Sequence, residues 1–127
     1  LAVLHHDTGQ LEAALACARE AAELGEGLTD AKTKLETINA LGTVLTAAGD
    51  HRGALAAFHR SLDLAARTGA AYWSAEARLG VAITLEAAGR RRQAVQAALL
   101  AVSEAELGGY RLVRDRALAV TRSQKKS

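Results

Sequence analysis

The residue types best suited to chemistry in this chain are four histidines and a single cysteine. His5 and His6 are neighbours on an expected helix, so their side chains point about 100° apart and do not chelate one metal together. His51 and His59 share a helix face but lie about 12 Å apart along its axis. The chain has no Cys–His cluster at zinc spacing, no phosphate-binding glycine loop and no nucleophile motif. We therefore expect no catalytic residue, no cofactor, no metal site and no enzymatic activity.

The lone cysteine and the hydropathy of the chain indicate where the protein works. Cys17 lies between two alanines on an expected helix with no activating partner, so we expect a small buried side chain and not a reactive thiol. A single cysteine excludes an internal disulfide and suits a reducing compartment. No segment reaches the about 18 consecutive apolar residues of a membrane span, and no signal peptide opens the chain. We expect a soluble, cytoplasmic protein with no membrane contact.

Glycines recur along the chain at a fixed spacing. Gly9, Gly49 and Gly89 are forty residues apart. Each is followed, at the same distance, by a small residue and an aliphatic one: Ala14-Leu15, Ala54-Leu55 and Ala94-Val95. Such a period is typical of a solenoid, in which one supersecondary unit is stacked on copies of itself. Because solenoids present surfaces, the repeat favours binding over catalysis.

The composition predicts helices as the elements of this repeat. Half of the 127 residues are hydrophobic, none is proline, and no stretch alternates as a strand would. We predict an all-α fold of about seven helices, over residues 1–8, 10–24, 31–48, 51–67, 70–88, 91–107 and 110–122. Asp30 and Asp50 are expected N-caps, whereas Arg90 replaces the capping aspartate of the following unit and should weaken that helix start by about 1 kcal/mol.

Short breaks between these helices predict antiparallel hairpins that stack into a right-handed α-solenoid. We expect one domain over residues 1–122, with repeat units at about 1–28, 29–68, 69–108 and a terminal helix at 109–122. Because the chain begins inside a repeat, we expect it to be part of a longer protein. Residues 123–127 are expected to form a disordered basic tail.

Basic residues concentrate after Leu107, at Arg111, Arg114, Arg116, Arg122, Lys125 and Lys126. A solvated terminal helix and tail is one interpretation, and contact with nucleic acid or an acidic neighbour is another. Tyr110 is the one aromatic residue among these charges, so a stacking platform for nucleic acid is not supported. We expect no direct nucleic-acid binding by this domain.

The repeat resembles the tetratricopeptide repeat (TPR) family. That family places an apolar residue, a small one and a large apolar one before a glycine, and an alanine five residues after it. The second unit carries Leu41-Gly42, Leu45, Gly49, Ala54-Leu55 and Phe58; the third carries Val81-Ala82, Leu85, Gly89 and Ala94-Val95; the first retains Leu1-Ala2, Gly9 and Ala14-Leu15. Three residues depart from the pattern: His5, Ala98 in place of an aromatic, and Arg78 where Ile38 stands one repeat earlier. Leu79-Gly80 also aligns with Leu41-Gly42 at a spacing of 38, which leaves the start of that helix open by two residues.

The resemblance implies that a ligand lies along the concave face formed by the first helix of each pair. Its positions in this sequence are Glu36, Asn39, Thr43 and Thr46 in one unit and Glu76, Leu79, Ile83 and Glu86 in the next; helical spacing adds Trp73 to the second set. Trp73 is the expected anchor, because aromatic residues dominate interface energetics. The carboxylates of this face predict a protein or peptide partner of basic or mixed charge.

The forty-residue unit is longer than the usual TPR unit of about 34 residues. Together with the Ala/Arg/Gly-rich composition, it resembles the C-terminal sensor arrays of bacterial multidomain transcriptional regulators. The leading hypothesis is a protein- or peptide-binding module of such a regulator. Two alternatives remain open. One is a scaffold that self-associates into a homo-oligomer through apolar end faces at Leu1, Val3 and Leu4. The other is a groove that senses a small-molecule effector.

Overall fold

The computed structural model describes residues 12–20, 23 and 30–122, and this part of the chain is helical apart from short turns. Residues 12–20 are helical and are followed by α2 (Ala31–Ala47), α3 (His51–Thr68), α4 (Ala71–Ala87), α5 (Arg91–Gly108) and α6 (Arg111–Arg122). The described residues thus contain six helices, where the sequence predicted about seven. The helix predicted over residues 1–8, with the end face at Leu1, Val3 and Leu4, and the tail at 123–127 lie outside the described residues.

The bounds of α2 to α6 agree with the predicted ones to within one residue, and they follow a half-repeat of twenty residues. The bounds of the helix predicted over 10–24 lie outside the described residues. The four glycines that end α2 to α5 or follow their last turns have positive φ angles: Gly49, Gly69, Gly89 and Gly109. This left-handed conformation strains any residue with a Cβ atom, which explains why glycine recurs there. After each glycine, the next amide donates to the carbonyl five residues back, as in Asp50 N to Leu45 O at 2.9 Å and Arg90 N to Leu85 O at 2.9 Å.

Helix starts differ in whether a side chain caps them. The Asp30 carboxylate accepts from Lys32 N at 3.0 Å, and the Asp50 carboxylate accepts from Gly53 N at 3.0 Å. Ala70 and Arg90 hold the same position before α4 and α5 but make no capping hydrogen bond. Both predicted aspartate caps and the missing cap at Arg90 are therefore confirmed.

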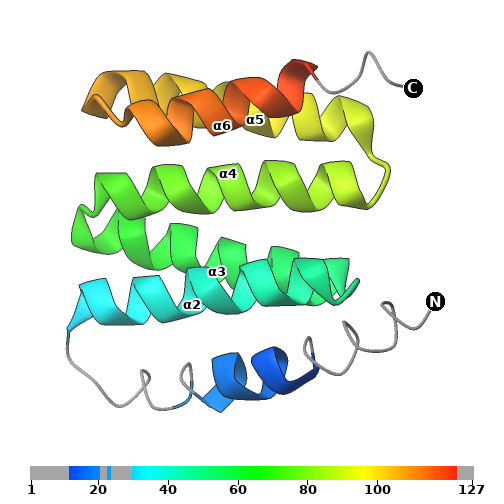
Figure 1. Cartoon of the computed structure of the whole chain (residues 1–127). Coiled ribbons are helices and arrows are strands. Elements are labelled where there is room, and N and C mark those ends of the chain that lie inside the picture. The colour runs from blue at the N-terminus through cyan, green and yellow to red at the C-terminus, as the bar shows by residue number, and fades with distance from the viewer. Residues whose placement is uncertain (1–11, 21–22, 24–29, 123–127) are drawn as a thin grey trace.

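The helices are stacked in a row, with residues 12–20 at one end and α6 at the other (Figure 1). From α2 to α6, each helix packs against the next in sequence, and α2 also contacts α4, which in turn contacts α6. Turns of two or three residues connect the helices from α2 to α6, so neighbours run in opposite directions. The central helix α4 is consequently packed against all four of the other labelled helices.

The core of this stack is built from alanine around one phenylalanine. Phe58 of α3 is 2% exposed, and its ring lies against Gly42 of α2 and Gly80 of α4. A Cβ atom at Gly42 would come within 2.6 Å of that ring, and one at Gly80 would also collide with it. Both glycines thus permit close approach of three helices.

The structure decides between the two alignments of α4 with α2, at spacings of 40 and 38 residues. This helix starts at Ala71, forty residues after Ala31 starts α2, so the helix bounds follow the forty-residue period. The spacing of 38 between Gly42 and Gly80 has a different origin, because both glycines touch the same ring from different helices.

Cys17, which was predicted to be buried, is exposed. Leu15 and Ala18 occupy the inward face of residues 12–20, and Cys17 lies two positions from Leu15, on the far side of the helix. Leu99 of α5 is 53% exposed, since the buried stripe of that helix passes through Ala98 and Ala101. Within the described part of the chain, no helix combines the length and apolarity that crossing a membrane requires.

Candidate binding surface

The nine residues predicted for the concave face lie on two helices that touch each other. Glu36, Asn39, Thr43 and Thr46 are on α2, and Trp73, Glu76, Leu79, Ile83 and Glu86 are on α4. Leu79 is 1% exposed and belongs to the core, so its place on the surface was wrongly predicted. Of the other eight, Glu36 and Thr43 are exposed, Asn39 is 8% exposed, and five are half-buried. The structure therefore brings the two sets together but leaves them unequally accessible.

Two of the α2 residues make contacts with α4. The Asn39 side chain reaches the backbone of Trp73, with 3.5 Å between Nδ2 and the carbonyl oxygen. The hydroxyl of Thr46 lies 2.7 Å from that of Thr84, a buried residue of α4 that sequence reasoning did not select. Asn39 Nδ2 and the Thr46 hydroxyl thus join α2 to α4, whereas the buried Asn39 Oδ1 has no hydrogen-bond partner in the part of the chain that the structure describes.

The carboxylates of α4 have partners within the chain. Glu76 accepts a hydrogen bond from the Tyr72 hydroxyl at 2.7 Å. Glu86 forms an ion pair with Arg91, 2.9 Å from Nη1 to Oε2, across the turn between α4 and α5. Because a guanidinium offsets one of the three carboxylates, the surface is less acidic than the sequence pattern alone indicated.

Three of the four aromatic residues of the chain meet at the N-terminal ends of α4 and α6. The Tyr72 ring lies edge-to-face against the Trp73 ring at 5.1 Å and against the Tyr110 ring at 5.1 Å, with interplanar angles of 82° and 89°. Edge-to-face contacts of this kind favour a fixed arrangement of the rings. We call Tyr72, Trp73 and Tyr110 the aromatic cluster; Tyr72 is 38% exposed and the other two are half-buried.

Sequence reasoning found Trp73 but not its two neighbours. Tyr72 and Tyr110 are 38 residues apart, the same spacing that separates Thr46 from Thr84. That spacing therefore relates residues in contact between alternate helices, from α2 to α4 and from α4 to α6. Counting 38 residues on from Tyr72 leads to Tyr110, so this spacing could have predicted the aromatic cluster from the sequence.

The Tyr72 hydroxyl is held in its neutral form. Its hydrogen bond to the Glu76 carboxylate, followed by burial and by the charge of Glu76, raises the pKa of Tyr72 to about 12, while Arg116 of α6 acts in the opposite direction. The aromatic cluster is thus flanked by one carboxylate and one guanidinium. A surface of rings with both charges beside it suits a partner of mixed charge.

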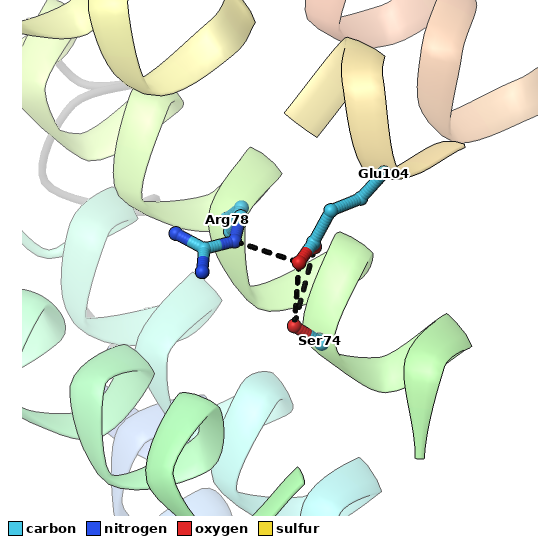
Figure 2. A network of polar contacts seen from close by, with 3 residues as sticks. All are labelled: Ser74, Arg78 and Glu104. Atoms are coloured by element: carbon cyan, nitrogen blue, oxygen red, sulfur yellow. Dashed lines mark hydrogen bonds and ion pairs between the residues drawn. The ribbon is translucent and has the colours of Figure 1, made fainter. Parts of the chain in front are cut away.

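A polar network joins α4 to α5 on another side of α4 (Figure 2). Arg78 Nε lies 3.0 Å from a carboxylate oxygen of Glu104, and the Ser74 hydroxyl lies 3.2 Å from both oxygens of that carboxylate. Ile38, the equivalent of Arg78 one repeat earlier, is 4% exposed, whereas the Arg78 side chain is 34% exposed. The ion pair explains how a charge replaces a core residue at this position.

A hollow of about 410 Å³ lies between α2 and α3, lined by Lys34, Ile38, Arg60, Asp63, Leu64 and Arg67. Asp63 pairs with Arg67 at 3.0 Å. Three cationic side chains against one carboxylate make this hollow positive. It contains the buried Ile38 of α2 and none of the residues predicted for binding.

No three His, Cys, Asp or Glu side chains gather as a metal site requires within the described ranges 12–20, 23 and 30–122. Comparison of the whole chain with protein-family models, with curated proteins and with solved structures found no significant match. The geometry of the surface itself is therefore the basis for a functional assignment.

Proposed function

We propose that this chain is a TPR-type α-solenoid that binds a protein or peptide segment along the face formed by α2, α4 and α6. Two features support the proposal. Helix pairs of identical length recur after forty residues, 31–68 and 71–108, and α4 contacts the first helix of both adjacent units. In a right-handed array of such pairs, the first helices line one continuous surface.

The observation that carries the proposal is the aromatic cluster. Alanine dominates this chain, yet three of its four aromatic rings lie together at one edge, and Tyr72 is the most exposed of them. Tyrosine and tryptophan are the residues most enriched at the energetic centres of interfaces. A purely structural role would favour burying these rings in the core, where Phe58 lies.

The charges beside the cluster favour a segment that carries basic residues. Glu36 is exposed, and the Glu76 carboxylate lies at the cluster with the Tyr72 hydroxyl as its donor. Arg91 offsets the charge of Glu86, and the charge of Arg116 acts on Tyr72. We infer that a lysine or arginine of the ligand approaches Glu76 while an apolar side chain contacts the rings.

The chain supplies its own probe for this interaction, since Trp73 is its one tryptophan. A random peptide library displayed on phage would be selected on the intact chain, and recovered peptides titrated by Trp73 fluorescence. We expect peptides enriched in lysine and arginine, a change in Trp73 emission on binding, and an affinity at least about tenfold lower for Tyr72→Ala. Gln96→Ala, an exposed change on α5, serves as the control.

Recovered peptides that bind the Tyr72→Ala variant as tightly as the wild type would contradict the assignment of the surface. Peptides with no basic enrichment, or with no response of Trp73 emission, would contradict the proposed orientation of the ligand. For the parent protein, we propose a bacterial transcriptional regulator in which this module senses a partner. A DNA-binding domain elsewhere in the same reading frame would support that placement, and an array of repeats alone would contradict it.

A second candidate function, sensing of a small anionic effector, is favoured by the cationic hollow between α2 and α3. Its volume of about 410 Å³ falls within the range of about 300–1,000 Å³ typical of ligand pockets. Inorganic phosphate at constant ionic strength is then expected to raise the melting temperature, and Lys34→Gln to abolish the rise. An equal rise for both proteins would contradict this candidate.

A further inference from the structure

A second, smaller hollow lies on a different side of the molecule from the aromatic cluster. Helices α3 and α5 both pack on α4, and about 170 Å³ of open space lies where the three meet. Each helix contributes two lining residues: His59 and Leu62 from α3, Arg78 and Val81 from α4, and Ala97 and Leu100 from α5. We call this the α3–α5 groove. Arg78 follows Glu76 by two residues and so points about 200° away from it around α4.

Most of the groove is apolar, and its rim is exposed. Val81 is 9% exposed at its floor, whereas Leu100 is 54% exposed at its edge. A hollow of about 170 Å³ is smaller than the about 300 Å³ at which small-molecule pockets begin. Its size suits one aliphatic side chain, with Leu100 in contact from the side. Single side chains inserted into such hollows are how helical segments of partner proteins are anchored.

A cation lines one wall of the groove. Arg78 is held by Glu104 through Nε at 3.0 Å, and its two terminal nitrogens point away from that carboxylate (Figure 2). The ion pair therefore fixes the guanidinium from one side and leaves its forked end directed elsewhere. This end matches the two oxygens of a carboxylate, which it binds through paired hydrogen bonds. Glu104 offsets the charge of Arg78, but the paired donors at the outer end of the guanidinium still favour a carboxylate over a neutral occupant.

We propose that the α3–α5 groove binds an amphipathic helical segment of a partner protein, which inserts an aliphatic side chain between Leu62 and Leu100 and pairs a carboxylate with Arg78. Positions three or four apart on a helix share one face, so one turn of the segment supplies both groups. This site is independent of the function proposed above. It differs from the aromatic surface in the sign of the charge it recognises.

The proposal is tested by selecting displayed helical peptides for binding to the intact chain. The peptides have about 15 residues, the length at which isolated helices become stable. Recovered peptides are expected to carry Leu, Ile or Met three or four positions from Asp or Glu. Leu100→Ala is expected to weaken their binding about tenfold, a typical value for an anchor residue. Leu99→Ala provides a matched control, because Leu99 is adjacent and 53% exposed but does not line the groove.

The charge is tested separately from the fold. Arg78→Gln and Glu104→Gln both break the same ion pair, but the first removes the guanidinium and the second releases it. We expect binding about tenfold weaker for Arg78→Gln and tighter than wild type for Glu104→Gln. If the ion pair acted only through stability, both variants would weaken binding alike. Replacing the acidic residue of the peptide by its amide repeats the test on the unaltered chain.

Three results would overturn the proposal: no recovered peptide, recovered peptides without acidic enrichment, or equal affinity for the wild type and Leu100→Ala. Circular dichroism at increasing temperature establishes that each variant remains helical.

Discussion

The hydroxyl oxygens of Thr46 and Thr84 lie 2.7 Å apart across the contact between α2 and α4. Each hydroxyl is also within hydrogen-bond distance of the carbonyl four residues before it, Gly42 O at 2.9 Å and Gly80 O at 2.8 Å. The two hydroxyl groups have two protons for three possible hydrogen bonds, so two of the three are made at any moment. Thr46, predicted to face a ligand, thus joins two helices through a fully buried partner.

This pairing predicts non-additive effects on stability. Thr84→Val keeps the shape of the side chain and lets Thr46 donate to its own carbonyl, so we expect a loss of about 1 kcal/mol in the free energy of unfolding. In the Thr84→Val variant, Thr46→Val should lower the free energy of unfolding by less than it does in the wild type, because the shared hydrogen bond is already gone. Urea unfolding of the two single variants and the double variant measures this, and additive costs would argue against a shared bond.

The contact of Phe58 with two glycines predicts a steric effect at each of them. Gly42→Ala and Gly80→Ala should each destabilise the fold by about 1–3 kcal/mol, although alanine ordinarily favours a helix over glycine, because the added methyl meets the Phe58 ring. Phe58→Leu combined with Gly80→Ala should recover part of that loss. Thermal unfolding is the measurement, and stabilisation by either alanine would show that the ring moves aside without cost.

The uncapped start of α5 predicts a simple stabilising change. The backbone at Arg90, with φ −96° and ψ 71°, closely matches that at Asp50, with φ −88° and ψ 76°, where the carboxylate caps α3. Arg90→Asp should therefore cap α5 in the same way and raise the free energy of unfolding by about 1 kcal/mol. Arg90→Ala is the control, because it also removes the cation from the helix N-terminus but supplies no group that accepts a capping hydrogen bond. Equal stability of these two variants would mean that no cap forms.

The raised pKa of Tyr72 predicts a stability change in alkaline solution. The pKa of Tyr72 is about 12 in the folded chain against an ordinary value of 10.0, so folding favours the protonated phenol. This contribution is fully present below pH 10 and is lost as the pH rises towards about 12, since the unfolded chain loses its proton first. Tyr72→Phe should show a flatter dependence over that interval.

The size of this effect is reduced by solvent, because Tyr72 is 38% exposed. Glu76→Gln should lower the pKa of Tyr72, since the hydrogen bond to Glu76 is the largest cause of the shift. A tyrosine titration followed by ultraviolet absorbance measures that pKa. An unchanged titration in Glu76→Gln would exclude that hydrogen bond as the cause.

Much of the candidate surface was predictable from residue spacing, but its accessible part was not. Helical periodicity placed Asn39 and Thr46 on one face of α2 and Trp73 and Glu76 on one face of α4. It could not indicate that Asn39 and Thr46 are used in the contact between these helices, nor that Tyr110, which directly precedes α6, completes the aromatic cluster. These contacts depend on how far one helix is displaced along another.

The helices follow from local features of the sequence. Asp30 and Asp50 cap helix starts, and glycines at twenty-residue intervals end them, because caps and left-handed turns are satisfied by hydrogen bonds within a few residues. Those bonds form whatever lies beyond the turn. Helix bounds and the all-helical class follow from them.

Tertiary structure alone decided which side chains meet. The ion pair of Arg78 with Glu104, the position of Phe58 between two glycines and the exposure of Cys17 all depend on the rotation and axial offset of whole helices. Both quantities are set by the sum of many alanine contacts along the stack, each of which is weak and non-directional. A local pattern of residues does not contain that sum, and so the surfaces available to a partner emerge only when the helices are packed.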